Sequence, residues 1–237
     1  MKFGIVVFPG TWSDTDCYFA VHDILNQDAE YVWHKDTNLD KFDCIILPGG
    51  FSYGDYLRPG AMAKLSPIMN SINEFASKDK LIIGICNGFQ ILCESGLLPG
   101  TLIKNTTLQF RCQWTNLVVT NNDTPFTNTC DKGSVLNIPI SHGEGNYFID
   151  NAGLHQLYEN DQVVLQYSDK NGVVTDQYNP NGSVNNIAGI ISKKRNVIGM
   201  MPHPERSCEA ILGSTDGNKI FESIINSIDG KLIKEQQ

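Results

Sequence analysis

Cys86 is the residue whose type and sequence setting most directly suggest chemistry. It follows the apolar run Leu81–Ile85 and precedes Gly88–Ser95, where apolar residues recur at helical spacing. Glycines stand two residues before and two residues after it, a pattern typical of the tight strand-to-helix turn that presents a nucleophile. There the sulfur lies at the carboxyl edge of a sheet, and the helix N-terminus stabilises a thiolate. The pattern predicts a cysteine nucleophile; the alternative is a core cysteine whose neighbouring glycines only permit close packing.

A thiol nucleophile needs a general base, and His203 is the histidine best placed to provide one. It closes the run Val197–Pro202 and is followed by Pro204 and Glu205. A proline at 204 favours extended backbone at residue 203, and side chains two residues apart in extended chain point the same way. Glu205 is therefore expected to orient the imidazole, in the order nucleophile, base, carboxylate. The alternative is a strand-end histidine beside a solvated glutamate.

Among the other histidines, His142 is the main rival base, because it lies in Ser141–Gly145 between a predicted strand and two glycines. A metal site formed by His142, Glu144, His203 and Glu205 is a further alternative. The spacing contains no third ligand group that would close such a set, so no metal is predicted. Three histidines have settings typical of surface or structural positions: His22, His34 and His155.

Acyl chemistry at Cys86 places negative charge on a carbonyl oxygen, which backbone N–H donors must stabilise. The N–H of Asn87 is one expected donor, since Asn87 directly follows the nucleophile. Gly50 is expected to supply the second, because the glycine pair after Pro48 ends the buried strand Cys44–Leu47. The alternative for this glycine pair is a plain turn.

Two further features favour a substrate site. The segment Phe51–Gly60 is rich in aromatic, charged and glycine residues, which is more typical of a binding loop than of a connection. Gln90 lies one helical turn after Cys86 on the same face, where its amide can hold a polar substrate. The alternative is an exposed helix glutamine.

Composition excludes several classes of protein. The chain has 237 residues, 41% hydrophobic and 19% charged, which is typical of a folded globular protein. The net charge of −8 argues against nucleic-acid binding, and no Lys/Arg run is longer than the three residues 193–195. Seven scattered cysteines without a Cys-x-x-Cys pair form neither a disulfide framework nor a zinc site. No apolar run approaches the ~18 residues of a membrane span, and the short N-terminal run is interpreted as a strand, so a cytoplasmic protein without membrane contact is expected.

Strands alternate with helices over the first hundred residues, which predicts a parallel sheet. Strands are expected at Lys2–Phe8, Glu30–Trp33, Cys44–Leu47 and Leu81–Ile85, and helices at Cys17–Leu25, Ile68–Ala76 and Gly88–Ser95. The later strands are expected at Thr101–Asn121, Ser134–Ile140, Val163–Tyr167 and Asn196–Met201, with little helix before a terminal helix at Ile220–Ile228. The predicted fold is a single α/β domain over residues 1–237, with a three-layer, mostly parallel central sheet flanked by helices and a small antiparallel addition.

Together, Pro48-Gly49-Gly50, residues 84–90 and His203-Pro204-Glu205 resemble the class I (triad) glutamine amidotransferases over nearly the whole chain. The longer stretches at 48–58, 86–90, 140–145 and 201–206 resemble one family among them, the separate glutaminase subunits of phosphoribosylformylglycinamidine synthase. The segment 9–14 departs from that family's first loop at Trp12, which affects this loop and its partner contacts rather than the triad.

The resemblance implies roles for individual residues. Cys86 is the nucleophile, His203 the base and Glu205 its orienting group, while Gly50 and Asn87 form the oxyanion hole. The residues expected to bind glutamine are Gln90, Phe51, His142 and Gly143. Ammonia would pass to a large synthetase subunit, assisted by a small accessory subunit. ATP and magnesium would act in that synthetase, with no cofactor in this chain.

Two other functions remain open from the residues alone. A free-standing cysteine hydrolase or protease would use the same cysteine and histidine without a synthetase. A silent regulatory module would need no triad at all. Glutaminase activity that rises on adding the synthetase would distinguish an amidotransferase subunit from both of these alternatives.

Overall fold

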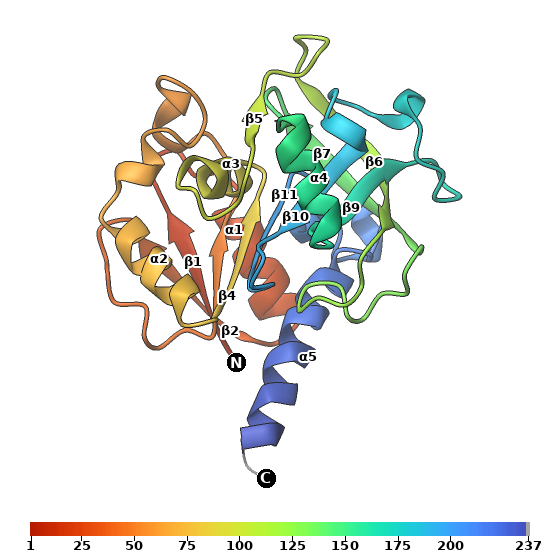
Figure 1. The fold of residues 1–237 in the computed structure, drawn as a ribbon. Coiled ribbons are helices and arrows are strands. Elements are labelled where there is room, and N and C mark those ends of the chain that lie inside the picture. The colour runs from red at the N-terminus through yellow and green to blue at the C-terminus, as the bar shows by residue number, and fades with distance from the viewer. Residues whose placement is uncertain (236–237) are drawn as a thin grey trace.

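The computed structural model describes residues 1–235, which form a nine-stranded mixed sheet with helices packed against it and a separate two-stranded ribbon (Figure 1). The strands are β1 (Lys2–Val7), β2 (Asp28–Trp33), β3 (Cys44–Leu47), β4 (Leu81–Ile85), β5 (Thr101–Ile103), β6 (Arg111–Val119), β7 (Val135–His142), β8 (Asn146–Phe148), β9 (Val163–Ser168), β10 (Ile187–Ile191) and β11 (Val197–Met200). The α-helices are α1 (Asp14–Tyr18), α2 (Ile68–Ser77), α3 (Asn87–Glu94), α4 (Asn151–Glu159) and α5 (Asn218–Glu235).

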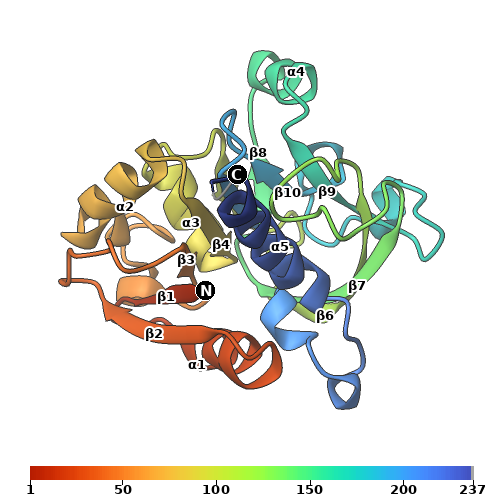
Figure 2. The ribbon, with the colours of Figure 1, turned by 90° about the horizontal axis from the view of Figure 1, so that it is seen from below.

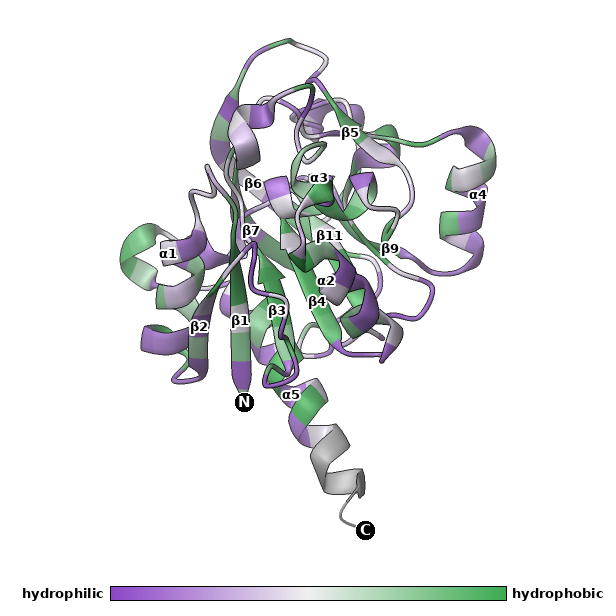
Figure 3. Ribbon diagram, turned by 90° about the vertical axis from the view of Figure 1, so that its left-hand side faces the viewer, coloured by the Kyte–Doolittle hydropathy of each residue, from purple (hydrophilic) through white to green (hydrophobic). Residues whose placement is uncertain are grey.

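The N-terminal half of the sheet is parallel, as the alternation of strands and helices predicts. Its strands run in the order β2-β1-β3-β4-β11, with β4 between β3 and β11. β3, β4 and β11 are buried at every position, because a parallel sheet covered on both faces needs near-continuous apolar strands. Figure 3 shows these strands as the hydrophobic centre of the molecule.

The second half of the sheet is antiparallel and continues the first without a break. From β11 the order is β10-β9-β6-β7, each strand antiparallel to its neighbour. β5 and β8 form the separate antiparallel ribbon. The predicted fold class is confirmed, and within residues 1–235 its antiparallel part is larger than expected, because four strands join the main sheet.

The helices lie on opposite faces of the parallel strands. Figure 2 shows α2 and α3 on one side of the sheet and α1 on the other. The α1 segment continues as a π-helical turn over Phe19–Ile24, so the helix expected at Cys17–Leu25 is present in a wider form. α5 begins on the side of α1, and both contact the turn at residues 204–206.

Two expectations for the middle of the chain were wrong in detail. The strand expected at Thr101–Asn121 is two strands, β5 and β6, separated by a loop in which Leu108 adopts a left-handed φ of 56°. The helix α4 was not expected, because Leu157 is its only fully buried residue and the apolar periodicity is weak. Its start is fixed by Asp150, whose side chain accepts the N–H of Gly153.

Among residues 1–235, no helix is both long enough and apolar enough to cross a membrane. The feature that matters for function is the shared carboxyl edge of β3, β4 and β11. Gly49 and Gly50 follow β3, Cys86 follows β4, and His203 lies three residues past β11. The topology therefore brings three separate motifs to one edge.

Candidate active site

Cys86 occupies the turn between β4 and α3 in a backbone conformation that only glycine adopts easily. Its φ of 51° and ψ of −105° place it outside the ordinary regions for an L-residue. Its N–H donates to the carbonyl of Met200 at 2.8 Å, which anchors the turn to β11. This is the nucleophile-elbow geometry that the glycine spacing predicts.

The glycines on either side of this turn are required by close backbone contacts. A Cβ at Gly84 would lie 2.7 Å from the carbonyl carbon of Gly88, and a Cβ at Gly88 would overlap the carbonyl oxygen of Leu47. Gly88 thus lets the first turn of α3 sit directly on the end of β3. Close packing at these glycines holds Cys86 in its strained conformation, so packing accompanies the predicted nucleophile turn and is no alternative to it.

Gly88→Ala is expected to lower the free energy of unfolding by about 2 kcal/mol and glutaminase turnover by about 100-fold, because the new methyl group must push α3 away from β3. Thermal unfolding and steady-state kinetics measure the two effects. The matched control is Gly230→Ala in α5, where a Cβ meets nothing within 4 Å. Unchanged activity in a normally stable Gly88→Ala protein would contradict the required contact.

His203 and Glu205 form a buried pair at the end of β11. The Nδ1 of His203 and the Oε1 of Glu205 are 2.6 Å apart, and both residues are at most 3% exposed. Pro204 begins a short 3-10 turn, Pro204–Arg206, so Glu205 reaches back through a turn. His203 has a φ of −103° and a ψ of 86°, so the expected extended chain does not continue into Glu205. The alternative of a solvated glutamate is wrong.

The electrostatics of this pair keep the imidazole protonated. Burial disfavours the charged ring, but the Glu205 carboxylate and the nearby Cys86 sulfur raise the pKa of His203 to about 10. The Nε2 of His203 is buried and has no nitrogen or oxygen partner among the described side chains, which leaves it to the Cys86 sulfur. An imidazolium with one nitrogen held by a carboxylate can donate the other proton to a leaving group.

Cys86 and His203 meet across Gly49. A Cβ at Gly49 would lie 2.7 Å from the Cε1 of His203 and 3.4 Å from the Cβ of Cys86, so only glycine leaves the space between them open. The Cys86 thiol donates to the carbonyl oxygen of Ser141 at 3.6 Å. The fold therefore brings nucleophile and base together while the thiol proton points to Ser141.

Two backbone N–H groups are candidate donors to an oxyanion: Asn87 directly follows Cys86, and Gly50 lines the same cavity as Cys86. Neither Gly50 nor Asn87 donates its N–H to an acceptor within residues 1–235. Gly50 has a φ of 145°, and its conformation is set by the Trp12 N–H bond to the Gly49 carbonyl at 3.1 Å. The ring of Trp12 is exposed, so the residue that departs from the expected first loop contributes its backbone here and leaves its ring free. The arrangement suits an oxyanion.

A cavity of about 180 Å³ opens above Cys86. That volume holds about six waters, which suits a small amide better than a peptide chain. Its lining residues come from the three motifs and the antiparallel half: Gly50, Phe51, Asp55, Pro59, Cys86, Gln90, Phe110, Ser141, His142, Gly143 and Glu144. All four residues expected to bind glutamine are among them.

Gln90 connects the walls of this cavity and is buried, so the alternative of an exposed glutamine is wrong. Its Nε2 donates to the carbonyl of Glu144 at 2.7 Å, and its Oε1 accepts from the Asn87 side chain at 2.9 Å. The Asn87 Oδ1 in turn accepts the N–H of Ser52 at 3.1 Å. The chain of amides fixes the loop after β3, the start of α3 and the end of β7 relative to one another.

His142 is a neutral donor and a poor base. Burial, and then the charge of His203, lower the pKa of His142 to about 3. Its Nε2 lies 3.0 Å from the Nδ2 of Asn181, which also donates to the carbonyl of Gly145 at 2.8 Å. His142 Nε2 is therefore an acceptor and Nδ1 carries the proton, buried and without a partner in the described chain. Within residues 1–235 no cluster of three or more His, Cys, Asp or Glu side chains is placed to hold a metal.

Sequence reasoning missed Asn181, and it did not single out Asp55 as a residue that lines the cavity. Asn181 is 39 residues from His142 in a turn, and no local pattern links the two. Asp55 lies in the loop that the composition marked as a binding segment, but the sequence does not show which of its residues points inward. The remaining three histidines are placed as expected, with His22 and His155 exposed and His34 buried against the Tyr53 hydroxyl at 3.0 Å.

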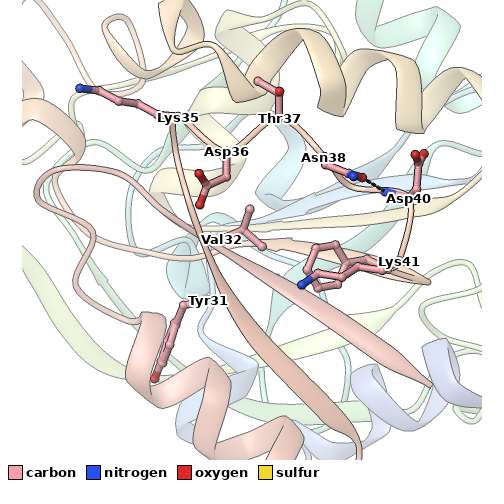
Figure 4. A pocket seen from close by; sticks show the side chains of 9 residues that line it. Tyr31, Val32, Lys35, Asp36, Thr37, Asn38, Asp40 and Lys41 are labelled. Atoms are coloured by element: carbon pink, nitrogen blue, oxygen red, sulfur yellow. Dashed lines mark hydrogen bonds between the residues drawn. The ribbon is translucent and has the colours of Figure 1, made fainter.

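A larger hollow elsewhere carries no comparable chemistry. Figure 4 shows it between β2 and the following loop, with Lys35 directed away from the other side chains. Its one hydrogen bond among the drawn residues joins the Asp40 N–H to Asn38 at 3.1 Å. It contains no cysteine and none of the predicted site residues, so the cavity at Cys86 is the candidate active site.

Comparison with known proteins places this geometry in context. Residues 1–224 match the model of the CobB/CobQ-like glutamine amidotransferase domain. The chain is 56% identical to phosphoribosylformylglycinamidine synthase subunit PurQ of Moorella thermoacetica, covering 95% of this chain and 96% of that one. It is 54% identical to the Salinibacter ruber protein of the same name, covering 96% and 97%. The structure of PurLQS from Thermotoga maritima contains a similar chain, with a TM-score of 0.85, 46% identity and coverage of 96% and 98%.

Proposed function

The chain belongs to the CobB/CobQ-like glutamine amidotransferase family, and we propose that in it Cys86, His203 and Glu205 hydrolyse glutamine as the catalytic residues of a phosphoribosylformylglycinamidine synthase glutaminase subunit. Relatives at 54–56% identity over nearly the full length carry the name of that subunit. The observation that carries the residue assignment is the strained Cys86 turn beside the buried His203–Glu205 pair.

The first half-reaction forms a thioester. The Cys86 thiolate attacks the side-chain amide carbon of glutamine, and the carbonyl π electrons move to oxygen. The N–H groups of Gly50 and Asn87 stabilise that oxyanion. When the intermediate collapses, the C–N bond breaks and His203 gives its proton to the leaving nitrogen, which departs as ammonia. Glu205 stabilises the imidazolium before this transfer.

The second half-reaction regenerates the enzyme. Neutral His203 takes a proton from a water, and the resulting hydroxide attacks the thioester carbon. The same two N–H groups stabilise the second oxyanion. Collapse breaks the C–S bond, so glutamate leaves and Cys86 returns as the thiolate paired with protonated His203. One glutamine and one water thus give one glutamate and one ammonia.

The ammonia is used by partner subunits. The Thermotoga maritima structure is named as a complex of PurL, PurQ and PurS. By that likeness, a large synthetase subunit and a small accessory subunit bind this chain, and ATP drives the conversion of formylglycinamide ribonucleotide to the formylglycinamidine ribonucleotide. We place ATP and magnesium in the large subunit, treat residues 1–237 as a single amidotransferase domain, and assign the complex to the cytoplasm.

The isolated chain is expected to be a weak glutaminase. In the isolated chain the Cys86 sulfur contacts the Ser141 carbonyl, and this contact must break before the sulfur can attack the glutamine amide. Adding the synthetase and accessory subunits is expected to raise glutaminase kcat/KM about tenfold or more, a normal size for coupling between sites. Glutamate release from L-glutamine measures this. Full activity of the chain alone, or activity toward peptides, would contradict the proposed function.

A further inference from the structure

The charged side chains that line the cavity above Cys86 are all acidic in the described part of the chain. Among the described residues that line it, two carry a full charge, Asp55 and Glu144, and both are acidic. The Oδ1 of Asp55 is buried and has no hydrogen-bond partner in the described chain. Glu144 contains no such orphaned oxygen and its carbonyl is already used by Gln90. A buried carboxylate oxygen without a donor is costly, so this atom needs a partner from outside the protein.

The loop that carries Asp55 is held in an unusual shape. Tyr53, Asp55 and Leu57 all have left-handed φ values, of 53°, 53° and 69°. The Tyr53 hydroxyl fixes the loop to the body through Ser66 at 2.7 Å and His34 at 3.0 Å. Strained backbone persists only where surrounding contacts determine it, and here the result is a carboxylate turned into the cavity.

The far wall of the cavity has the opposite polarity. The Nδ1–H of His142 is buried without an acceptor, and His142 itself is 3% exposed. The N–H of Gly143 donates to no acceptor within residues 1–235. The cavity is thus lined by an acidic side chain on the loop after β3 and, at the end of β7, by two residues whose N–H donors have no acceptor in the described chain. An α-amino acid head group carries the matching pair, an ammonium and a carboxylate.

We propose that the Asp55 carboxylate binds the α-ammonium of glutamine and makes the enzyme specific for an amide that carries a free α-amino group. This inference rests on the proposed glutaminase function. Burial, and then the charge of Glu144, raise the pKa of Asp55 to about 6. A cation bound beside Asp55 would relieve that unfavourable charge.

The test compares L-glutamine with glutaramate, which has the same side-chain amide and carboxylate but lacks the ammonium. In the assembled complex, Asp55→Asn is expected to lower kcat/KM for L-glutamine about 30-fold or more, since truncating one member of a buried charge pair is costly. For glutaramate, the kcat/KM of Asp55→Asn should stay within about threefold of the wild-type value. If glutaramate turnover is too slow to follow, its inhibition constant against L-glutamine replaces kcat/KM.

The matched control is Asp161→Asn, which makes the same substitution at an exposed aspartate with a similar φ of 50°. This control is expected to leave kcat/KM unchanged for both L-glutamine and glutaramate. Equal losses for both substrates in Asp55→Asn, or a selective loss in Glu144→Gln in its place, would overturn the assignment of Asp55. A wild-type complex that hydrolyses neither substrate would instead overturn the proposed function itself.

Discussion

Cys86→Ala is expected to lower glutamine-dependent synthesis by the assembled complex at least about 10⁴-fold, while synthesis from free ammonium continues at close to the wild-type rate. The loss is large because the thiolate forms the acyl intermediate, and neither the N–H groups of Gly50 and Asn87 nor the His203–Glu205 pair can replace it. Ammonium bypasses this step, since the ATP-dependent chemistry is assigned to the large subunit.

Two controls make this result specific. Cys112→Ala removes the exposed cysteine, which lies outside the cavity, and is expected to leave both activities unchanged. Thermal unfolding of Cys86→Ala reports whether the strained turn still forms; alanine at a φ of 51° pays the same backbone cost as cysteine. Loss of both glutamine- and ammonium-dependent synthesis in a folded complex would mean that Cys86 is structural.

The parallel half of the fold was predictable because its strands are buried on both faces. β3 and β4 have the predicted bounds, since four or five consecutive apolar residues leave little choice of register or length. The antiparallel half was predicted less well. β7 alternates between buried and half-buried residues and is interrupted by Pro139, so its sequence shows a strand but not its place in the main sheet.

The site, like the fold, was predictable only where a local sequence pattern determines it. Cys86 and His203 could be proposed as candidates from local pattern, because a strained turn and a strand end show in the spacing of glycine and proline. Contacts made by backbone atoms of distant segments could not be predicted from the sequence. The Ser141 carbonyl that holds the thiol proton is 55 residues from Cys86, and its side-chain type has no bearing on that contact.

The second large effect concerns the base. His203→Ala is expected to lower glutaminase turnover about 10⁴-fold, because no other described group near the sulfur can donate a proton to the leaving nitrogen at neutral pH. His142 cannot substitute, since its pKa lies near 3 and its Nε2 is committed to Asn181. The loss of glutaminase turnover in Glu205→Gln is expected to be roughly 10- to 100-fold smaller than in His203→Ala, because the amide still holds the ring in place.

The pH profile separates orientation by Glu205 from a merely structural role. The carboxylate of Glu205 is the largest influence that raises the pKa of His203, to about 10, so the wild-type rate should persist into the alkaline range and fall only as the imidazolium loses its proton. In Glu205→Gln burial remains and the carboxylate charge is gone, so the pKa of His203 falls and the alkaline limb moves to lower pH. Turnover measured from pH 6 to pH 10.5 tests this shift. A variant that is slower but keeps the wild-type alkaline limb would show that Glu205 supports the fold rather than the charge on His203.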